Sequence, residues 1–163
     1  MRRFVVLVHK VPVTGTFTLN DLAGGAGRMD EIARAVSTGF TLSNDLRKDT
    51  EMVLLFPPSG AVSARRIRLD GTRIRYLNPD ERSTAALLKN ALVRSIPIDH
   101  DVESSPGIVV GPVDNRQSPR IVHHLAADFN AVADINGTAR RDADVIDDLQ
   151  FSGTALHLSL IHI

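Results

Sequence analysis

The sequence contains no cysteine, no tryptophan and a single tyrosine among its 163 residues. Without cysteine the chain can form neither disulfides nor thiolate metal sites, and it suits a reducing cytosol, so we expect a cytoplasmic protein. No apolar run approaches the roughly 20 residues of a membrane-spanning helix, so we expect no membrane partner. Basic and acidic residues are equal in number, at 19 each. A nucleic acid would therefore have to be attracted by a local basic patch rather than by the whole chain.

The remaining composition is that of an ordinary globular domain, with 43% hydrophobic and 23% charged residues. The length suffices for one domain with a substantial core. Two apolar runs predict buried strands, namely residues 3–9, which contain β-branched valines, and residues 52–56, which are apolar throughout. Between them, apolar residues recur at helical spacing and predict a helix over residues 29–42. These elements indicate a single α/β domain over residues 1–157.

A second helix is predicted from residue 79 onward. Asn78 is expected to be its N-cap, because the side-chain oxygen can accept a free backbone N–H. Pro79 suits the first helical position, and Glu81 can complete a capping box. The apolar stripe of this helix consists of Ala85, Leu88, Ala91 and Leu92. Arg82 is a cation in the first turn, where the helix dipole opposes it. It is either solvated, paired within the helix, or in contact with an anion at the helix N-terminus.

Residues 64–77 predict a β-hairpin with Asp70-Gly71 as its two-residue turn. In that register Ile67, Leu69 and Ile74 face the core. The other face carries four arginines, namely Arg66, Arg68, Arg73 and Arg75. Like charges placed opposite one another repel, so this face requires carboxylates, open solvent or a polyanion nearby. An RNA backbone is one such polyanion, and a solvated arginine face is the alternative.

Two polar loops have both a structural and a functional interpretation. Gly24, Gly25 and Gly27 precede the first helix, as in phosphate-binding loops, but their spacing fits neither a Walker A nor a GxGxxG motif. Residues 44–49 carry Asp45, Arg47, Lys48 and Asp49. This second loop is either a solvated turn or a cluster of charged groups beside a substrate.

The second half of the chain carries fewer signals. We expect a connector over residues 96–105 and a short strand over residues 108–110. A short helix is expected over residues 120–127. We also expect a hairpin over residues 131–140 that turns at Asn136-Gly137, and the beginning of another strand over residues 154–159. His123 and His124 lie on the predicted short helix. Adjacent side chains of a helix point in different directions and cannot bind one metal ion from one face, so we expect no metal site.

Four segments stand out in chain order: residues 24–30 (GGAGRMD), 42–49 (LSNDLRKD), 77–87 (LNPDERSTAAL) and 103–110 (ESSPGIVV). Together they resemble the archaeal tRNA pseudouridine-54 N1-methyltransferases, which belong to the SPOUT, or knotted, superfamily. Four such segments, in the same order across the first two-thirds of the chain, make the resemblance specific. The sequence departs from the family pattern at Asn44, where the family tends to carry histidine.

The resemblance implies an α/β fold with a SPOUT-like, Rossmann-type sheet and helices on both faces. It also implies a C-terminal trefoil-knot half that holds S-adenosyl-L-methionine (SAM) and supplies much of a homodimer interface. Residues 154–159 match the start of the strand that opens this half, and the rest of the half is missing from the sequence. Leu158 corresponds to a cofactor-lining position.

The activity implied by the resemblance is transfer of a methyl group from SAM to N1 of a pseudouridine in the T-loop of tRNA. The N1–H of pseudouridine must lose its proton, so the site needs a carboxylate or a cation that stabilises the anionic base. By this resemblance we expect Asp45 to be the base or a proton relay. The expected phosphate or base contacts are Arg28, Arg47 and Arg82, and the expected sequence-independent backbone contacts are Arg66, Arg68, Arg73 and Arg75.

Residues 158–163 (LSLIHI) match the translation of a transposase end sequence used in DNA-library preparation, ctg-tct-ctt-ata-cac-atc. We therefore expect these residues to be a non-native tail on a truncated domain, and the chain as given to be an inactive fragment. The alternative is a short protein that ends on an exposed apolar edge strand.

Two other functions stay open at this point. One is a non-catalytic RNA-binding domain that uses the arginine-rich hairpin alone. The other is a metal-dependent hydrolase that uses His9, His100 and the pair His123 and His124, although no spacing of His, Asp and Glu residues supports it.

Overall fold

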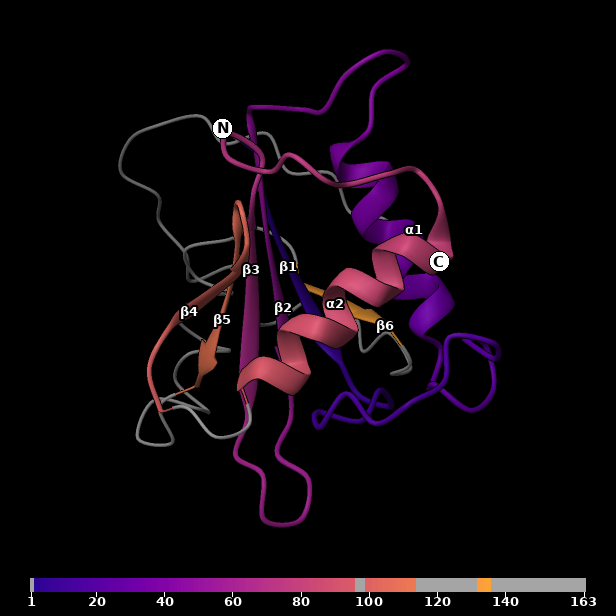
Figure 1. Cartoon of the computed structure of the whole chain (residues 1–163), viewed down its shortest axis with the longest axis vertical. Helices are drawn as coiled ribbons and strands as arrows, with labels where there is room; N and C mark the ends of the chain where they lie inside the picture. Colours follow the sequence, from indigo (N-terminus) through magenta and orange to yellow (C-terminus); the bar gives the residue numbers. More distant parts are fainter. Residues whose placement is uncertain (1, 96–98, 114–131, 136–163) are drawn as a thin grey trace, which may run out of the picture.

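The computed structural model describes residues 2–95, 99–113 and 132–135, which form one sheet and two helices (Figure 1). In chain order the elements are β1 (Arg2–Val8), α1 (Met29–Phe40), β2 (Thr50–Phe56), β3 (Arg65–Asp70), α2 (Glu81–Ser95), β4 (Val102–Ser105), β5 (Ile108–Pro112) and β6 (Val132–Ile135). The six strands are ordered β4-β5-β3-β2-β1-β6. β1 pairs in parallel with β2 and β6, whereas the β2–β3, β3–β5 and β4–β5 pairs are antiparallel.

The predicted α/β fold class is confirmed, and the sheet is mixed, with both parallel and antiparallel strand pairs. Neither helix in this part of the chain is long and apolar enough to cross a membrane.

The main core lies between the two helices and one face of the sheet. Successive strand residues point to opposite faces, so alternate side chains such as Val6, Leu54 and Ile67 point into this core and are buried. Val36 of α1 and Leu88 of α2 meet them there. The strands predicted over residues 3–9 and 52–56, and the helices predicted over residues 29–42 and from residue 79, therefore form because their apolar periodicities match one shared core.

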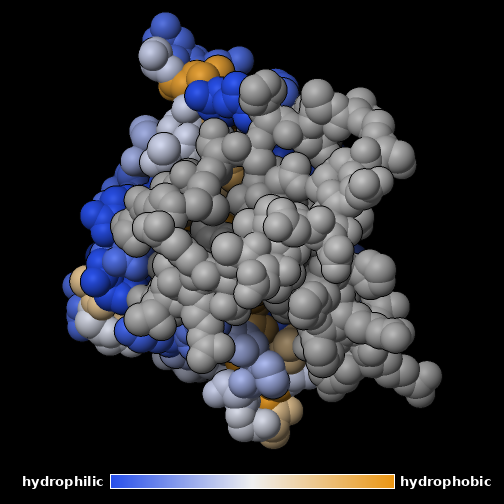
Figure 2. All heavy atoms as spheres, turned by 180° about the vertical axis from the view of Figure 1, so that it is seen from behind, coloured by the Kyte–Doolittle hydropathy of each residue, from blue (hydrophilic) through white to orange (hydrophobic). Residues whose placement is uncertain are grey.

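The opposite face of the sheet carries a smaller apolar cluster, formed by Val5, Val53, Leu55, Ala64 and Val113. Both described helices lie on the other side, so the predicted arrangement with helices on both faces depends on residues beyond the described ranges. Figure 2 views the molecule from behind, and the described residues visible at its margins are mostly hydrophilic.

The second helix starts two residues later than predicted, and its N-cap is Asp80 rather than Asn78. The Asp80 Oδ2 accepts the backbone N–H of Ser83 at 2.8 Å, and this hydrogen bond holds the pKa of Asp80 below its ordinary value of 3.8. Asn78 contributes its backbone carbonyl, which accepts the hydroxyl of Thr84 at 3.2 Å. Glu81 forms no capping box either, since its carboxylate faces the guanidinium of Arg34 at 3.6 Å. The prediction failed because Asn78 and Asp80 can both cap a helix and lie two positions apart. Asp80 is the better cap here, since its negative charge is favourable at the helix N-terminus.

The predicted hairpin over residues 64–77 is wrong. β3 forms, but it pairs with β2 on one side and with β5 on the other, so no edge is left for residues 72–77. The chain turns out of the sheet instead, where the Asp70 carbonyl accepts the N–H groups of Arg73 at 3.0 Å and Ile74 at 2.9 Å. Gly71 does not have the positive φ that a two-residue hairpin turn requires. Glycine is needed there because a Cβ would collide with the backbone carbonyl of Arg47.

The hairpin at this end of the sheet is formed by β4 and β5, around Pro106 and Gly107, and Gly107 has a φ of 79°. The sequence predicted β5 but described residues 96–105 as a connector, so β4 was missed. Its sequence, Val-Glu-Ser-Ser, is short and polar, as is common in edge strands, and lacks apolar alternation.

Several predictions fall outside the described residues. They are the helix over 120–127 with His123 and His124, the turn at Asn136-Gly137, the strand over 154–159 with Leu158, the knotted half and the tail from residue 158. Residues 132–135, from the first half of the predicted second hairpin, are strand β6.

Replacing Asp80 by alanine should lower the thermal unfolding midpoint at pH 7, because Ser83 loses its acceptor. The control, Asn78→Ala, should leave the midpoint nearly unchanged. Folding lowers the pKa of Asp80 below its ordinary value of 3.8. The ionised carboxylate therefore stabilises the fold fully above pH 3.8, and this stabilisation is lost as the pH falls through the lower pKa of the folded state. The difference between wild type and Asp80→Ala should therefore shrink below about pH 4. Equal losses in both variants would contradict Asp80 as the cap.

Candidate nucleic-acid interface

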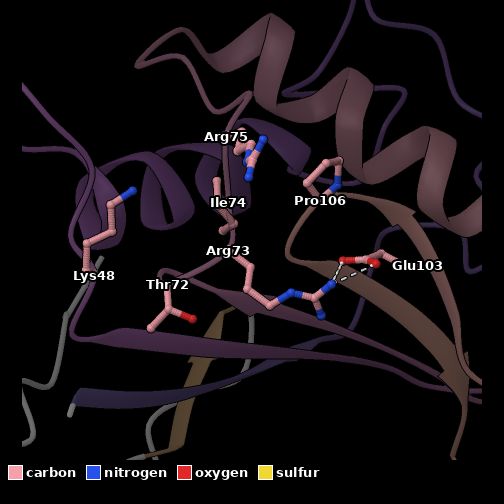
Figure 3. Close-up of a pocket in the computed structure, with 7 residues that line it drawn as sticks. All are labelled: Lys48, Thr72, Arg73, Ile74, Arg75, Glu103 and Pro106. Carbon is pink, nitrogen blue, oxygen red and sulfur yellow. Dashed lines mark hydrogen bonds and ion pairs between the residues drawn. The ribbon is translucent and has the colours of Figure 1, made fainter.

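An open pocket of about 390 Å³ lies where the chain leaves β3 (Figure 3). Its lining residues are Lys48, Thr72, Arg73, Ile74, Arg75, Glu103 and Pro106. In Figure 3 Lys48 and Pro106 stand on opposite sides, and Arg73 reaches across toward Glu103. Three segments distant in sequence therefore meet here: the loop before β2, the turn after β3 and the β4–β5 hairpin.

The basic wall of the pocket is held by its neighbours in sequence. Ile74 and Leu77 are 1% and 6% exposed and insert into the main core. Arg73 and Arg75 flank Ile74 and are exposed. Because the apolar side chains fix the backbone from one side, the charged side chains project from a supported segment rather than from a free loop.

Among the described cations that line the pocket, Arg73 is the one held by an ion pair. Its Nη2 lies 2.8 Å and 3.0 Å from the two carboxylate oxygens of Glu103. Glu103 also accepts the backbone N–H of Gly107 at 2.9 Å, and that hydrogen bond, followed by the charge of Arg73, lowers the pKa of Glu103. Glu103 is therefore ionised at neutral pH and holds Arg73 in place.

The pocket has a surplus of positive charge. Lys48, Arg73 and Arg75 contribute three cations, and Glu103 is the single carboxylate among the lining residues. Within the described residues, no hydrogen bond or ion pair engages the side chain of Lys48 or Arg75. Two cations are thus available to an anion such as a phosphate group.

The four arginines of the predicted hairpin do not share one face. Arg73 and Arg75 line the pocket, whereas Arg66 and Arg68 project from β3 on the sheet face opposite to the helices. Arg66 forms an ion pair with Asp101 at 2.5 Å. Arg68 is exposed. Burial acts to raise the pKa of Asp70, but hydrogen bonds from Thr72, followed by the charges of Arg68 and Arg73, lower it below its ordinary value. The structure thus divides the predicted patch between two surfaces.

Arg28 and Arg82 lie elsewhere, near the beginnings of α1 and α2. Arg28 donates to both carboxylate oxygens of Asp30, at 3.1 and 3.2 Å, and pairs with Glu31. The hydrogen bonds to Asp30 raise the pKa of Arg28. Arg82 donates through Nη1 to the carbonyl of Leu19 and to Oδ1 of Asn20, both at 2.9 Å. Both arginines therefore stabilise the local structure, whatever else they bind.

The glycine-rich loop before α1 already surrounds an anion of its own. The Asp21 carboxylate accepts the N–H of Gly24 at 2.9 Å and that of Gly25 at 2.7 Å. These bonds, that of Gly25 first, lower the pKa of Asp21. A phosphate would have to displace this carboxylate, so the loop is not an open phosphate site.

The loop that carries Asp45 and Arg47 follows α1 directly. Asp45 is exposed; its Oδ1 accepts the N–H of Leu46 at 2.7 Å, and its carbonyl accepts that of Leu42 at 2.8 Å. The N–H of Arg47 donates to the carbonyl of Phe40 at 2.7 Å, and the next residue, Lys48, reaches the pocket. The exposed Asp45 carboxylate is thus held in a structured turn, three residues before Lys48.

Among the described residues, no group of three or more histidine and acidic side chains is placed to hold a metal ion. His9 and His100 are both exposed there. Leu158, the predicted cofactor-lining residue, and the pair His123 and His124 lie outside the described ranges.

Some lining residues were not predicted as functional. Lys48 was noted in its loop but not as an RNA contact, and Thr72, Glu103 and Pro106 were not singled out as site residues. Glu103 and Pro106 do belong to one of the four segments on which the family resemblance rests. That segment was a signal for them, but only the fold brings it beside Arg73.

Comparison with known proteins gives consistent matches. The model of a family of SAM-dependent RNA methyltransferases matches residues 1–132. Proteins named tRNA (pseudouridine(54)-N(1))-methyltransferase are similar to the chain. The protein of Methanocella arvoryzae is 51% identical over 112 residues, covering 68% of this chain and 57% of the relative. That of Methanocorpusculum labreanum is 39% identical over 154 residues, covering 91% and 74%. That of Haloferax volcanii is 46% identical over 112 residues, covering 68% and 54%.

The chain thus spans little more than half the length of several curated relatives that it matches.

Replacing Lys48 and Arg75 together by alanine should weaken binding to a single-stranded RNA and flatten its salt dependence. Each lost phosphate contact should reduce the slope of log K against log salt by about 0.7, so we expect a change of roughly 0.7 to 1.4. Binding is measured by fluorescence anisotropy of labelled RNA over a salt series.

The control is Arg34→Ala, which also removes a cation. Arg34 pairs with Asp30 at 2.8 Å on the helical side of the molecule. An equal change of slope in this variant would show that the effect comes from net charge, and would contradict the pocket as an RNA contact.

Proposed function

The chain belongs to the family of SAM-dependent RNA methyltransferases, and from this we propose that the protein methylates N1 of pseudouridine-54 in tRNA. The observation that carries the proposal is the match over residues 1–132, together with relatives that are named for this reaction. The basic pocket supports it independently, because an RNA substrate requires a positive surface on a chain with no net charge.

The chemistry of the substrate assigns a role to a carboxylate. N1 of pseudouridine carries a proton, and the nitrogen becomes a good nucleophile only when that proton is removed. We assign this step to Asp45, as general base or proton relay, because its carboxylate is exposed in a structured turn. A neighbouring cation such as Arg47 would stabilise the negative charge that develops on the base.

Recognition of the RNA is assigned chiefly to the pocket. Lys48 and Arg75 are available for backbone phosphates, and Arg73 is held ready by Glu103. Arg66 and Arg68 are kept as backbone contacts on a second surface, the sheet face opposite to the helices. Arg28 and Arg82 are kept as secondary contacts, since both already bind groups of the protein itself. Such phosphate contacts position the substrate, whereas target choice rests on the shape of the loop and an exposed base.

The cofactor does not fit the pocket described above. SAM supplies the methyl group and carries it on a positively charged sulfonium. A pocket with three cations and one paired carboxylate repels such a group. We therefore assign SAM binding to residues outside the described ranges, with Leu158 as a lining residue. A homodimer and a cytoplasmic site of action on tRNA, both expected from the sequence and the family resemblance, remain parts of the proposal.

A non-catalytic RNA-binding domain is the second candidate. The observation that favours it is the basic pocket, which can bind RNA phosphates without any cofactor. This candidate predicts salt-dependent affinity for RNA without methyl transfer.

Methyl transfer should be measured with labelled SAM on two tRNA transcripts that differ only in having pseudouridine or uridine at position 54. The chain is tested alone and joined to the C-terminal part of the Methanocella arvoryzae relative, which restores the length of that protein. We expect the joined protein to label only the pseudouridine-containing tRNA. RNA binding without any transfer by the joined protein would favour the non-catalytic candidate.

In the joined protein, Asp45→Asn should lower the rate of methyl transfer by about 10² or more, while RNA affinity stays within a factor of about two. Asp49→Asn is the control in the same loop; Asp49 lies 3.8 Å from the guanidinium of Arg2. An Asp45→Asn protein that retains the full rate would exclude Asp45 as the base.

A further inference from the structure

Tyr76 is the most exposed of the large hydrophobic side chains in the described part of the chain, at 66%. It is also the single tyrosine of the sequence, which has no tryptophan. An isolated exposed apolar residue is common and carries no meaning by itself. The position of Tyr76 is what gives it significance, because it directly follows Arg75 and lies three residues after Arg73, and both arginines line the basic pocket.

The backbone around Tyr76 is held at two points. Ile74 and Leu77, on either side, are buried in the main core, and α2 starts soon after with its cap at Asp80. Arg75 and Tyr76, between these two anchors, are both exposed. The aromatic ring therefore projects from a fixed segment, and little conformational entropy is lost when a flat ligand covers it.

The pocket is lined by Arg75, the residue that precedes Tyr76, and its charge indicates what kind of ligand can cover the ring. Arg75 lines the pocket and is adjacent to Tyr76 in the chain, so their Cα atoms are about 3.8 Å apart. Lys48 and Arg75 are free to bind an anion, as described above. A ligand that presents a phosphate beside a flat aromatic group matches both features, and a nucleotide of single-stranded RNA is such a ligand.

We propose that Tyr76 and the basic pocket form one binding site for single-stranded RNA. A backbone phosphate binds Lys48 and Arg75, Arg73 contributes charge from its ion pair with Glu103, and an unpaired base stacks on the ring of Tyr76. This site rests on the proposed function, since it supposes an RNA substrate. It goes beyond that function by naming the residues that hold an exposed loop of the RNA. Leu42 and Val93, the other exposed large hydrophobic residues described, are aliphatic and offer no ring for stacking.

The sequence provides a direct reporter for this site. With one tyrosine and no tryptophan, the intrinsic fluorescence of the protein comes from Tyr76 alone. The full chain is titrated with a short, unstructured oligoribonucleotide, and tyrosine emission is recorded alongside the anisotropy of the labelled RNA. N-acetyltyrosinamide, titrated in parallel, corrects for light absorbed by the RNA. We expect emission to be quenched to saturation with the same dissociation constant as the anisotropy change.

Three variants separate stacking from charge. Tyr76→Leu keeps an apolar side chain but removes the ring, and should weaken binding roughly 5- to 150-fold without changing the salt slope. Tyr76→Phe should bind within a factor of about two of wild type, because stacking needs the ring rather than the hydroxyl. Arg75→Ala should reduce the salt slope instead. An abasic oligonucleotide of the same length should bind Tyr76→Leu and wild type equally. Circular dichroism confirms that each variant is folded.

The possible failures can be told apart. Unchanged tyrosine emission at saturating RNA, or wild-type affinity in Tyr76→Leu, would overturn the stacking site whatever the enzymatic activity. If the emission per molecule changed with protein concentration in the absence of RNA, Tyr76 would be a contact between two copies of the chain. That result would also overturn the stacking site. Loss of methyl transfer in the joined protein, with quenching intact, would contradict the proposed function and leave the RNA site standing.

Discussion

The strand β3 is hydrogen-bonded on both sides, and much of this structure follows from that pairing. β2 occupies one edge of β3 and β5 occupies the other, so the chain must leave the sheet at Asp70. Ile74 and Leu77 then return to the core, and the residues beside them, Arg73, Arg75 and Tyr76, are left at the surface. Because β5 is part of a hairpin with β4, the same pairing brings Glu103 and Pro106 to the pocket. A basic pocket is thus a consequence of strand order.

The charges of the chain cancel in total, but they are distributed unevenly over the surface. At the beginnings of the two helices, Arg28 and Arg34 are matched with Asp30, Glu31 and Glu81. In the pocket, three cations face one carboxylate, and that carboxylate is already paired with Arg73. Local imbalance of this kind attracts a polyanion at short range, where exposed charges are not yet screened by salt. A neutral chain can therefore bind RNA at one defined place.

The two incorrect local predictions have the same origin. Asp70-Gly71 has the composition of a hairpin turn, and Asn78-Pro79 has that of a helix start, and both patterns are read from a few neighbouring residues. The hairpin is decided by contacts from further away, because Gly71 lies against the carbonyl of Arg47 and β5 takes the edge that the hairpin would need. The helix start is decided within the first turn, where the carboxylate of Asp80 accepts the N–H of Ser83. Local signals specify which conformations are possible, and packing selects among them.

The sequence alone was sufficient for the class of fold, for β1, α1, β2 and β5, for most of α2, and for the family, because these rest on apolar periodicity and on ordered motifs that each lie within one short segment. It also identified Arg73 and Arg75 as candidate RNA contacts, although through a hairpin that does not exist. Only the tertiary structure decided that these two arginines separate from Arg66 and Arg68, that Glu103 holds Arg73, and that Lys48 lines the same pocket. These relations join residues up to 55 positions apart, from Lys48 to Glu103, and depend on strand order, which no local pattern in the sequence encodes.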